Sequence, residues 1–242
     1  MNYFLTIIIL IFAGSIAGSL LGIIKKPTAR MLCGFLSFAG GMMVFISLIH
    51  LLPESIKLTN WAISIVAVIV GALLIWLIDK SLPHINPELA KKEKPNIKRT
   101  AAMLVIGMAI HNLPEGLAVS GGFTVIPKLG FLVALSIALH DIPEAIATVV
   151  PVFAASGKRL KSFLISSTVV AFEFVGFLAG YFIFKNISPL ALGIALALTA
   201  GIMMYLSFEE LFPCAKMRKY PVISTLAVLL SFIFVLITRF LL

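Results

Sequence analysis

Two short segments of the chain repeat one pattern of histidine, proline and glutamate. The first reads I-H-N-L-P-E-G-L-A over residues 110–118, and the second reads L-H-D-I-P-E-A-I-A over residues 139–147. Both lie within long apolar stretches, where a histidine, a proline and a glutamate are each unfavourable. Because imidazole and carboxylate groups together bind divalent transition metals, the repeated pattern predicts a divalent-metal site in the middle of a membrane.

Within each copy the histidine and the glutamate are four residues apart, so they project from one face of a helix. The residue after each histidine, Asn112 or Asp141, lies about 100° further around the helix and can face a second position beside the first. Each proline frees the backbone carbonyl one residue before its histidine. This spacing predicts two adjacent metal ions that share carboxylates. The candidate ligands in the two copies are His111, Asn112, Glu115, His140, Asp141 and Glu144.

The acidic residues of the chain are unevenly distributed. No lysine or arginine lies at comparable depth to pair with the four that lie deep in apolar stretches, which are Glu115, Asp141, Glu144 and Glu173. An unpaired ionised carboxylate in such a place is strongly disfavoured, so it either takes up a proton or holds a metal. The four negative charges would neutralise two divalent cations. Imidazole and carboxylate ligands without thiolate suit zinc, iron(II) and manganese, and they argue against copper(I) and against an all-oxygen calcium site.

The composition of the whole chain is that of an integral membrane protein. Of its 242 residues, 61% are hydrophobic and 12% are charged, whereas a soluble domain is about half apolar and a quarter charged. Eight apolar runs are long enough to cross about 30 Å of hydrocarbon as helices. They lie at about 3–24, 31–52, 60–79, 100–121, 127–153, 160–184, 188–212 and 221–241. We therefore predict an all-α, eight-helix transmembrane bundle in one domain, 1–242, whose first run is a retained helix rather than a cleaved signal peptide.

The net charge of +9 reflects topology rather than binding to nucleic acid. Fifteen of the 19 basic residues follow spans 1, 3, 5 and 7, and therefore lie on one side of the membrane. Because loops rich in lysine and arginine stay in the cytoplasm, both termini are predicted outside, with the chain in the cytoplasmic membrane if it is bacterial. The longest loop, at 80–99, is polar and contains three prolines, so we expect it to be mobile.

Two pairs of similar sequences run in opposite directions across the membrane. Residues 40–53 resemble residues 200–213 at an offset of 160, and the two histidine-containing copies form the second pair. The distribution of basic residues directs one member of each pair outward and the other inward. Such pairs are typical of inverted-topology repeats, in which the substrate site lies near the bilayer midplane. We expect spans 1–3 and 6–8 to be related in this way around a central pair formed by spans 4 and 5.

At these motifs the chain resembles the ZIP family of divalent-metal transporters, most closely its bacterial ZupT-like branch. The paired motifs of spans 4 and 5 are the specific part of the resemblance, which S-F-E-E-L-F-P in span 7 and S-L-I-H-L-L-P in span 2 support. The family's binuclear centre implies that one metal ion is surrounded by His111, Glu115, His140 and Glu144. It implies that the other is held by Asn112, Asp141 and Glu173, the last on the likeness of F-E-F-V-G to the family's A-E-x-x-G. Residues along the pathway or at the cytoplasmic exit would be His50, Glu209 and Glu210.

The resemblance implies a function and a set of partners. Divalent ions would be carried into the cytoplasm, zinc first, with iron, manganese, cadmium and cobalt as alternatives, and no enzymatic activity or cofactor is expected. The chain has Asp141 where bacterial relatives often have asparagine, and Ala145 where glycine is usual. The extra carboxylate is expected to strengthen cation binding at the second position and to alter selectivity. Gly176 and Gly180 could pack within the bundle or between the protomers of a homodimer.

Two other interpretations remain open on the sequence. A membrane-embedded zinc-dependent hydrolase would also hold its metal with three protein ligands and an open position. The motif H-E-x-x-H is missing, however, and no separate nucleophile or general base stands out. A structural metal or a cluster of protonated acids could instead lock the bundle. The duplication in antiparallel helices favours a two-sided pathway over a one-sided pocket.

Overall fold

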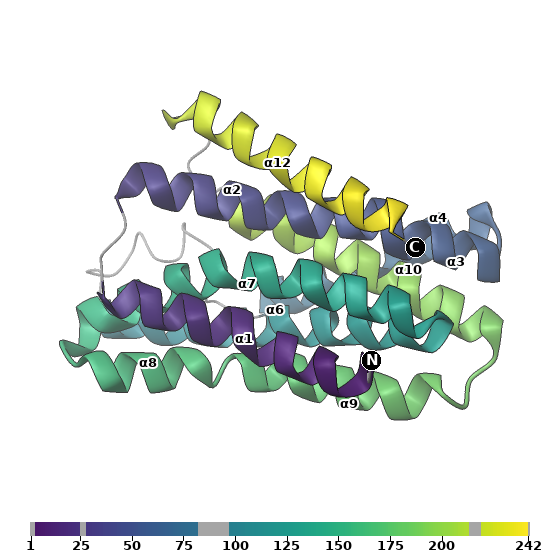
Figure 1. Cartoon of the computed structure of the whole chain (residues 1–242), viewed down its shortest axis with the longest axis horizontal. Coiled ribbons are helices and arrows are strands. Elements are labelled where there is room, and N and C mark those ends of the chain that lie inside the picture. Colours follow the sequence, from purple (N-terminus) through teal and green to yellow (C-terminus); the bar gives the residue numbers. More distant parts are fainter. Residues whose placement is uncertain (1–2, 25–27, 82–96, 213–218, 242) are drawn as a thin grey trace.

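Long helices run side by side through the whole molecule (Figure 1). The computed structural model describes residues 3–24, 28–81, 97–212 and 219–241, and at a few helical positions it describes the backbone alone. Every element within these ranges is helical. In chain order the elements are α1 (Tyr3–Ile24), α2 (Ala29–Ile46), the π-helix η1 (Ser47–Leu51), α3 (Leu52–Leu58), α4 (Trp61–Ser81), α6 (Ile97–Val125), α7 (Pro127–Ser156), α8 (Arg159–Ser167), α9 (Val170–Phe184), α10 (Pro189–Leu206), the π-helix η2 (Ser207–Leu211) and α12 (Pro221–Phe240).

The helices have the length and composition needed to cross a bilayer. Seven segments of the described chain are long and apolar enough to do so, and the remaining predicted span is α6, which has 29 residues. Spans 2, 6 and 7 each join two or more elements in line. Both termini lie at one end of the molecule (Figure 1). The predicted all-α membrane bundle is confirmed, whereas the predicted mobile loop at 80–99 falls mainly outside the described residues.

The two π-helices occupy equivalent places in spans 2 and 7. They begin at Ser47 and Ser207, which are 160 residues apart. In each, the serine hydroxyl donates a hydrogen bond of 2.8 Å to a methionine carbonyl four residues earlier. Short π-helical turns of this kind are rare and occur often at functional sites. The same local irregularity at the same offset agrees with the predicted pairing of residues 40–53 with 200–213.

The helix contacts also follow the predicted repeat. α1 packs along α7 as α9 packs along α6, and α2 packs along α12 as α10 packs along α4. If spans 1–3 are exchanged with spans 6–8, and α6 with α7, the contact of α1 with α7 becomes the contact of α9 with α6. The contact of α2 with α12 likewise becomes the contact of α10 with α4. Two groups of helices result, one containing α1, α6, α7, α8 and α9 and the other containing α2, α3, α4, α10 and α12. They meet chiefly where α2 touches α7 and where α10 touches α6.

Glycines allow the closest helix approaches in the first group. A Cβ at Gly18 of α1 would overlap the carbonyl oxygen of Ile142, and one at Gly176 of α9 would overlap that of Leu113. Ile142 and Leu113 stand at the same place in the two motif copies, between the histidine and the proline. Gly176 therefore serves packing within the bundle, which is one of the two roles left open on the sequence.

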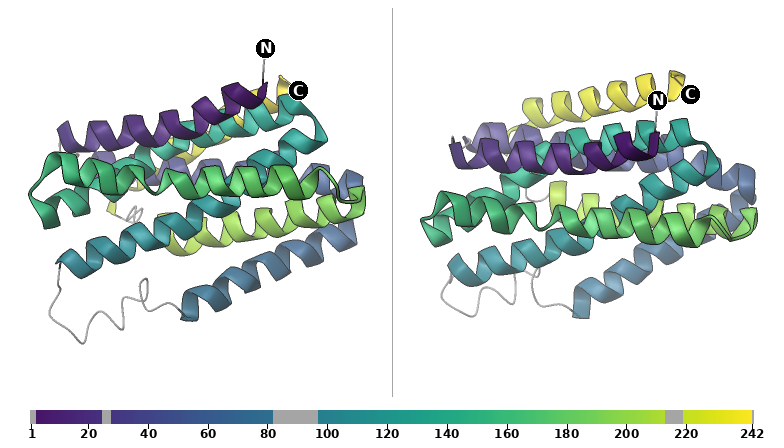
Figure 2. Two further views of the ribbon diagram at one scale, coloured as in Figure 1. Left: turned by 90° about the horizontal axis from the view of Figure 1, so that it is seen from below. Right: turned by 60° about the horizontal axis from the view of Figure 1, so that its bottom comes forward.

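The central helices of the bundle are α6 and α7. In the apolar window of α7, 78% of the residues are buried, against 22% in the window of α4. α4 accordingly lies at the edge of the molecule beside α10 (Figure 2). Span 6 is interrupted where α8 ends and α9 begins, and the amide of Val169 bonds there to the carbonyl of Ser166 at 3.2 Å. This interruption puts Glu173 in the first turn of α9.

Candidate metal centre

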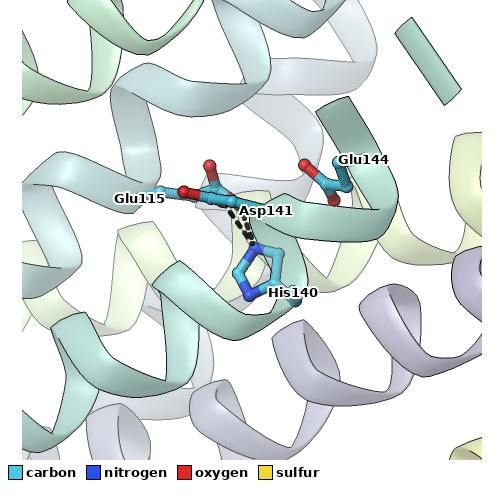
Figure 3. A group of neighbouring side chains, drawn as sticks. All are labelled: Glu115, His140, Asp141 and Glu144. Atoms are coloured by element: carbon cyan, nitrogen blue, oxygen red, sulfur yellow. Dashed lines mark hydrogen bonds and ion pairs between the residues drawn. The ribbon is translucent and has the colours of Figure 1, made fainter. Parts of the chain in front are cut away.

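Four predicted ligands converge between α6 and α7 (Figure 3). One ligand atom from each side chain lies within 4.8 Å of the others, and all four residues are buried; they are Glu115, His140, Asp141 and Glu144. The antiparallel course of α6 and α7 explains the convergence, because each helix presents its motif from the middle of its length. We call this group the carboxylate cluster.

The imidazole of His140 is hydrogen-bonded to Glu115 within the cluster. Its Nε2 atom donates a hydrogen bond of 2.7 Å to Oε1 of Glu115 and lies 3.7 Å from Oδ1 of Asp141. The histidine Nδ1 atom has no hydrogen-bond partner in the described part of the chain. Imidazole nitrogen and carboxylate oxygen are the atoms that zinc prefers after thiolate. The hydrogen bond between His140 and Glu115 therefore holds two potential metal-ligand atoms, Nε2 and Oε1, close together.

The second predicted position is rich in carboxylate and amide oxygen atoms. Glu173 lies close enough to interact electrostatically with Asp141, Glu115 and Glu144. Within the described residues, no donor reaches either carboxylate oxygen of Asp141 or of Glu173, or Oδ1 of Asn112. Buried acceptors are normally satisfied. An arrangement of facing acceptors is chemically suited to a cation, whose charge would replace the missing donors.

A small cavity adjoins this second position. Its volume is about 10 Å³, which is room for roughly one water molecule. Besides Asn112, Asp141 and Glu144 it is lined by three hydroxyl groups, those of Ser15, Thr148 and Ser166. The sequence interpretation missed these hydroxyls, although Ser166 lies four residues after another serine, as one face of a helix requires. Their meeting depends on α1 and α8, which no motif connects to the cluster.

The remaining predicted site residues are placed differently. His50 is buried away from the carboxylate cluster, and its Nε2 atom lies 2.9 Å from Oγ1 of Thr238. Glu209 is exposed. The backbone at His111 and Glu210 is helical, in α6 and η2 respectively, but their side chains lie outside the described part of the structure. The predicted roles of these four residues stay predictions.

Glu54 is a buried acid that the sequence placed at the end of a span. Its Oε1 atom lies 2.6 Å from Nζ of Lys57 and 3.4 Å from Nη1 of Arg239. The second contact joins α3 to α12. Because Glu54 already has two cationic partners, it acts as a link between helices, in contrast to the acids of the carboxylate cluster.

Comparison with known proteins identifies the family. A family model described as ZIP Zinc transporter matches residues 88–239, which is more than half of the chain. The chain belongs to the ZIP zinc transporter family. Proteins named zinc transporter ZupT from Enterobacter sp. (strain 638) and from Salmonella arizonae are each 38% identical to it over 213 residues. These alignments cover 84% of this chain and 83% of each relative.

Membership in the ZIP family decides between two interpretations that the sequence left open. The family consists of transporters, so the chain is a transporter rather than a membrane-embedded hydrolase. The resemblance drawn from the H-N-L-P-E-G motif is thereby confirmed. The family match says nothing of individual ligands, and the geometry of the carboxylate cluster is the evidence for those.

Proposed function

We propose that the protein carries divalent metal ions, zinc first, across the membrane through the carboxylate cluster. The observation that carries this proposal is the meeting of Glu115, His140, Asp141 and Glu144 within 4.8 Å at the centre of a membrane bundle. Three buried carboxylates gathered beside one imidazole would be unfavourable in hydrocarbon, and a bound cation would relieve their mutual repulsion. Zinc transport by the relatives of the same family supports zinc as the ion.

Two metal positions follow from the same residues. The first is formed by Glu115, His140 and Glu144, with His111 as a further ligand by its place in the motif. The second would be formed by Asn112, Asp141 and Glu173, whose buried side-chain oxygen atoms Oδ1, Oδ1 and Oδ2, and Oε1 and Oε2 have no hydrogen-bond donor among the described residues. Glu115 and Glu144 would bridge the two ions. Nitrogen and oxygen ligands of this kind also accept iron(II), manganese, cadmium and cobalt.

Transport requires the site to be exposed to each side of the membrane in turn. The two groups of helices, which touch chiefly through α2 with α7 and α10 with α6, offer a natural division for such a motion. Inverted repeats commonly produce alternating access around a site near the midplane. The direction is into the cytoplasm, across the inner membrane of a bacterium, with both termini outside and the basic loops inside.

Removal of one carboxylate tests the proposal directly. Purified protein in liposomes is expected to take up zinc, and Glu115→Gln is expected to reduce the initial rate at least about a hundredfold, because the amide can neither bridge two ions nor balance their charge. The substituted protein should keep its elution volume and its melting temperature in detergent. Glu93→Gln, in the polar loop at 80–99, is the matched control and should leave uptake unchanged.

The outcomes separate the alternatives. Zinc uptake by Glu115→Gln at the rate of the unsubstituted protein would remove this carboxylate from the site. Zinc that binds tightly to the unsubstituted protein and never exchanges would indicate a structural metal instead of a transported one.

A further inference from the structure

An apolar groove opens on the side of the molecule where α2, α7 and α12 meet. Its volume is about 610 Å³, which is within the range of roughly 300–1,000 Å³ that ligand sites have. Arg30 lies at one end of it, and every other residue that lines it is apolar. The three helices contact one another and lie side by side (Figure 1). The groove is therefore a feature of their shared surface.

The groove follows two helices that run in the same direction. On α2 its lining residues extend from Arg30 to Phe38, and on α12 they extend from Ile223 to Leu230. A helix rises about 1.5 Å per residue, so the part of α2 between Arg30 and Phe38 spans about 12 Å. One leaflet of a bilayer contributes about 15 Å of hydrocarbon. The groove therefore extends through most of the depth of one leaflet.

The third wall of the groove is the second copy of the histidine-containing motif. The residues of α7 that line the groove are Leu139, Ile142 and Pro143. They are interleaved with His140 and Glu144, so the apolar and the ligand-bearing residues occupy different faces of one helix. Because α7 belongs to one group of helices and α2 and α12 to the other, an occupant of the groove would touch both groups.

Two cations lie at the end of the groove that bears Arg30. The guanidinium carbon of Arg30 lies 5.9 Å from the ring centroid of Tyr220, and Nζ of Lys219 lies 5.6 Å from the same centroid. Both cationic side chains are exposed. Among the described residues, no acidic side chain forms an ion pair with either of them. The tyrosine ring thus holds two positive charges near each other without neutralising them.

The sequence around this end is basic throughout. Residues 24–53 and 211–242 contain no acidic residue. Four more basic residues precede the two helices in the chain, and they are Lys25, Lys26, Lys216 and Arg218. Because basic loops stay in the cytoplasm, this end of the groove is predicted to lie at the cytoplasmic surface. The cytoplasmic leaflet is also the one whose anionic lipids attract basic segments.

We propose that the groove binds one anionic phospholipid of the cytoplasmic leaflet, with an acyl chain along α2 and α12 and the phosphate beside Arg30 and Lys219. An apolar groove with two cations at one end complements a molecule that has an apolar chain and an anionic head. A free anion would leave the apolar lining uncovered, and a zwitterionic lipid would bring its own ammonium group to the two cations. The proposal is independent of metal transport, because the lipid would bind whether or not the protein carries metal ions.

The first test measures which lipid stays bound. The protein is purified in detergent that contains equal amounts of phosphatidylglycerol and phosphatidylcholine, and native mass spectrometry counts the retained lipids. We expect one phosphatidylglycerol per chain to be retained in preference to phosphatidylcholine. Arg30→Gln with Lys219→Gln is expected to lower the affinity for phosphatidylglycerol at least about tenfold, because both charges beside the phosphate are lost.

A matched control removes the same charge elsewhere. Lys158→Gln with Lys161→Gln changes two exposed lysines at the same predicted face of the membrane, and it should leave the affinity unchanged. Equal retention of the two lipids, equal affinity of the two double variants, or displacement of phosphatidylglycerol by inorganic phosphate would overturn the proposal. A lipid-free dimer that covers the groove would likewise assign this surface to a second copy of the chain.

The second test locates the acyl chain. Leu226 lines the groove and Leu229 of the same helix does not, although both are about equally exposed, at 55% and 50%. Leu226→Trp and Leu229→Trp are made separately in a background of Trp61→Phe with Trp76→Phe. Each protein is placed in phosphatidylcholine vesicles with a small fraction of phosphatidylglycerol that is brominated in its chains.

The bromine atoms quench the fluorescence of a tryptophan beside them. We expect quenching of Leu226→Trp to be at least about twofold greater than that of Leu229→Trp. Adding Arg30→Gln and Lys219→Gln should remove this difference, because the lipid is then no longer held by its head. Equal quenching of the two tryptophan variants at every fraction of brominated lipid would indicate bulk lipid alone and would contradict the proposed site.

Discussion

Asp141 is a buried acid at a position where the two motif copies differ. One motif copy has Asn112 at this place and the other has Asp141, so the two halves of the second position differ by one charge. The carboxylate of Asp141 interacts electrostatically with Glu173, Glu115 and Glu144, and no donor within the described residues reaches its oxygen atoms. A cation at the proposed second position would satisfy these acidic groups together, and it would make such a concentration of negative charge compatible with a membrane interior.

Neutralising this carboxylate should weaken the second position specifically. We expect Asp141→Asn to lower zinc affinity at that position about tenfold, or about 1.4 kcal/mol, because an amide oxygen remains but a charge is lost. Titration with zinc against a competing chelator would resolve one site that is unchanged and one that is weakened. Asp79→Asn, at the end of span 3, is the control for the same chemical change. Equal affinity of Asp141→Asn and the unsubstituted protein at both positions would exclude Asp141 as a ligand.

His50 and Glu54 show how differently buried polar residues can be satisfied. His50 bonds to Thr238, and Glu54 is held by Lys57 and Arg239. These contacts tie spans 2 and 8 together near the end that bears the termini. Paired groups of this kind stabilise a helix contact, whereas the cluster between α6 and α7 concentrates acids beside a single imidazole. The difference in partners is what distinguishes the candidate site from ordinary polar contacts.

At the scale of the helices, three of the spans contain irregular backbone: spans 2, 6 and 7. Span 6 is interrupted at Thr168 and Val169, between α8 and α9, and Glu173 lies in the first turn after this interruption. Spans 2 and 7 contain π-helical turns at equivalent positions. Discontinuous helices at the midplane are a recurring device of transporters, because irregular backbone is tolerated in a membrane only where it lines protein or a cavity.

Close approach of α9 to α6 depends on glycine. We expect Gly176→Ala to destabilise the protein by about 1–3 kcal/mol, since its Cβ would overlap the backbone at Leu113 and neither helix can yield easily. A fall in melting temperature in detergent would register the effect. Gly34→Ala is a suitable control, because its Cβ would meet only the side chain of Ile223, at 3.1 Å. Equal melting temperatures for the two variants would contradict the proposed close contact.

At the scale of the whole molecule, the candidate site belongs to one group of helices. α1, α6, α7, α8 and α9 enclose the carboxylate cluster and the small cavity beside it. The other group, which includes α4 at the edge, contacts it chiefly through α2 and α10 (Figure 2). A group that contains the whole site can change its position relative to the other without dismantling the site. The alternating access proposed for this protein is therefore compatible with a rigid ligand set.

The charge distribution predicts the orientation of the chain in the membrane. Both termini lie at the end opposite the turn at 156–159 (Figure 1), and the basic residues of that turn predict a cytoplasmic location. In a background without cysteine, Leu241→Cys should be modified by an impermeant thiol reagent on intact cells, and Lys158→Cys only after permeabilisation. The reverse pattern would invert the predicted topology.

The sequence by itself determined the features that depend on local pattern. Eight apolar runs predicted the helices, because length and hydrophobicity suffice for a span. The spacing of His140, Asp141 and Glu144 placed their side chains around one helix, because helical periodicity is fixed. The offset of 160 residues located equivalent segments that the structure shows with matching π-helices.

Only the tertiary structure decided which helices pack together and which side chains contact each buried acid. It brought Glu115 of α6 to the ligands of α7, put Ser15 and Ser166 beside them, and gave Glu54 its cationic partners. Contacts between residues far apart in the chain arise from the packing of whole helices, which local periodicity does not encode. Serine in an apolar helix is compatible with lipid, with close packing or with a polar route, and the neighbouring helices determine which of these environments it has.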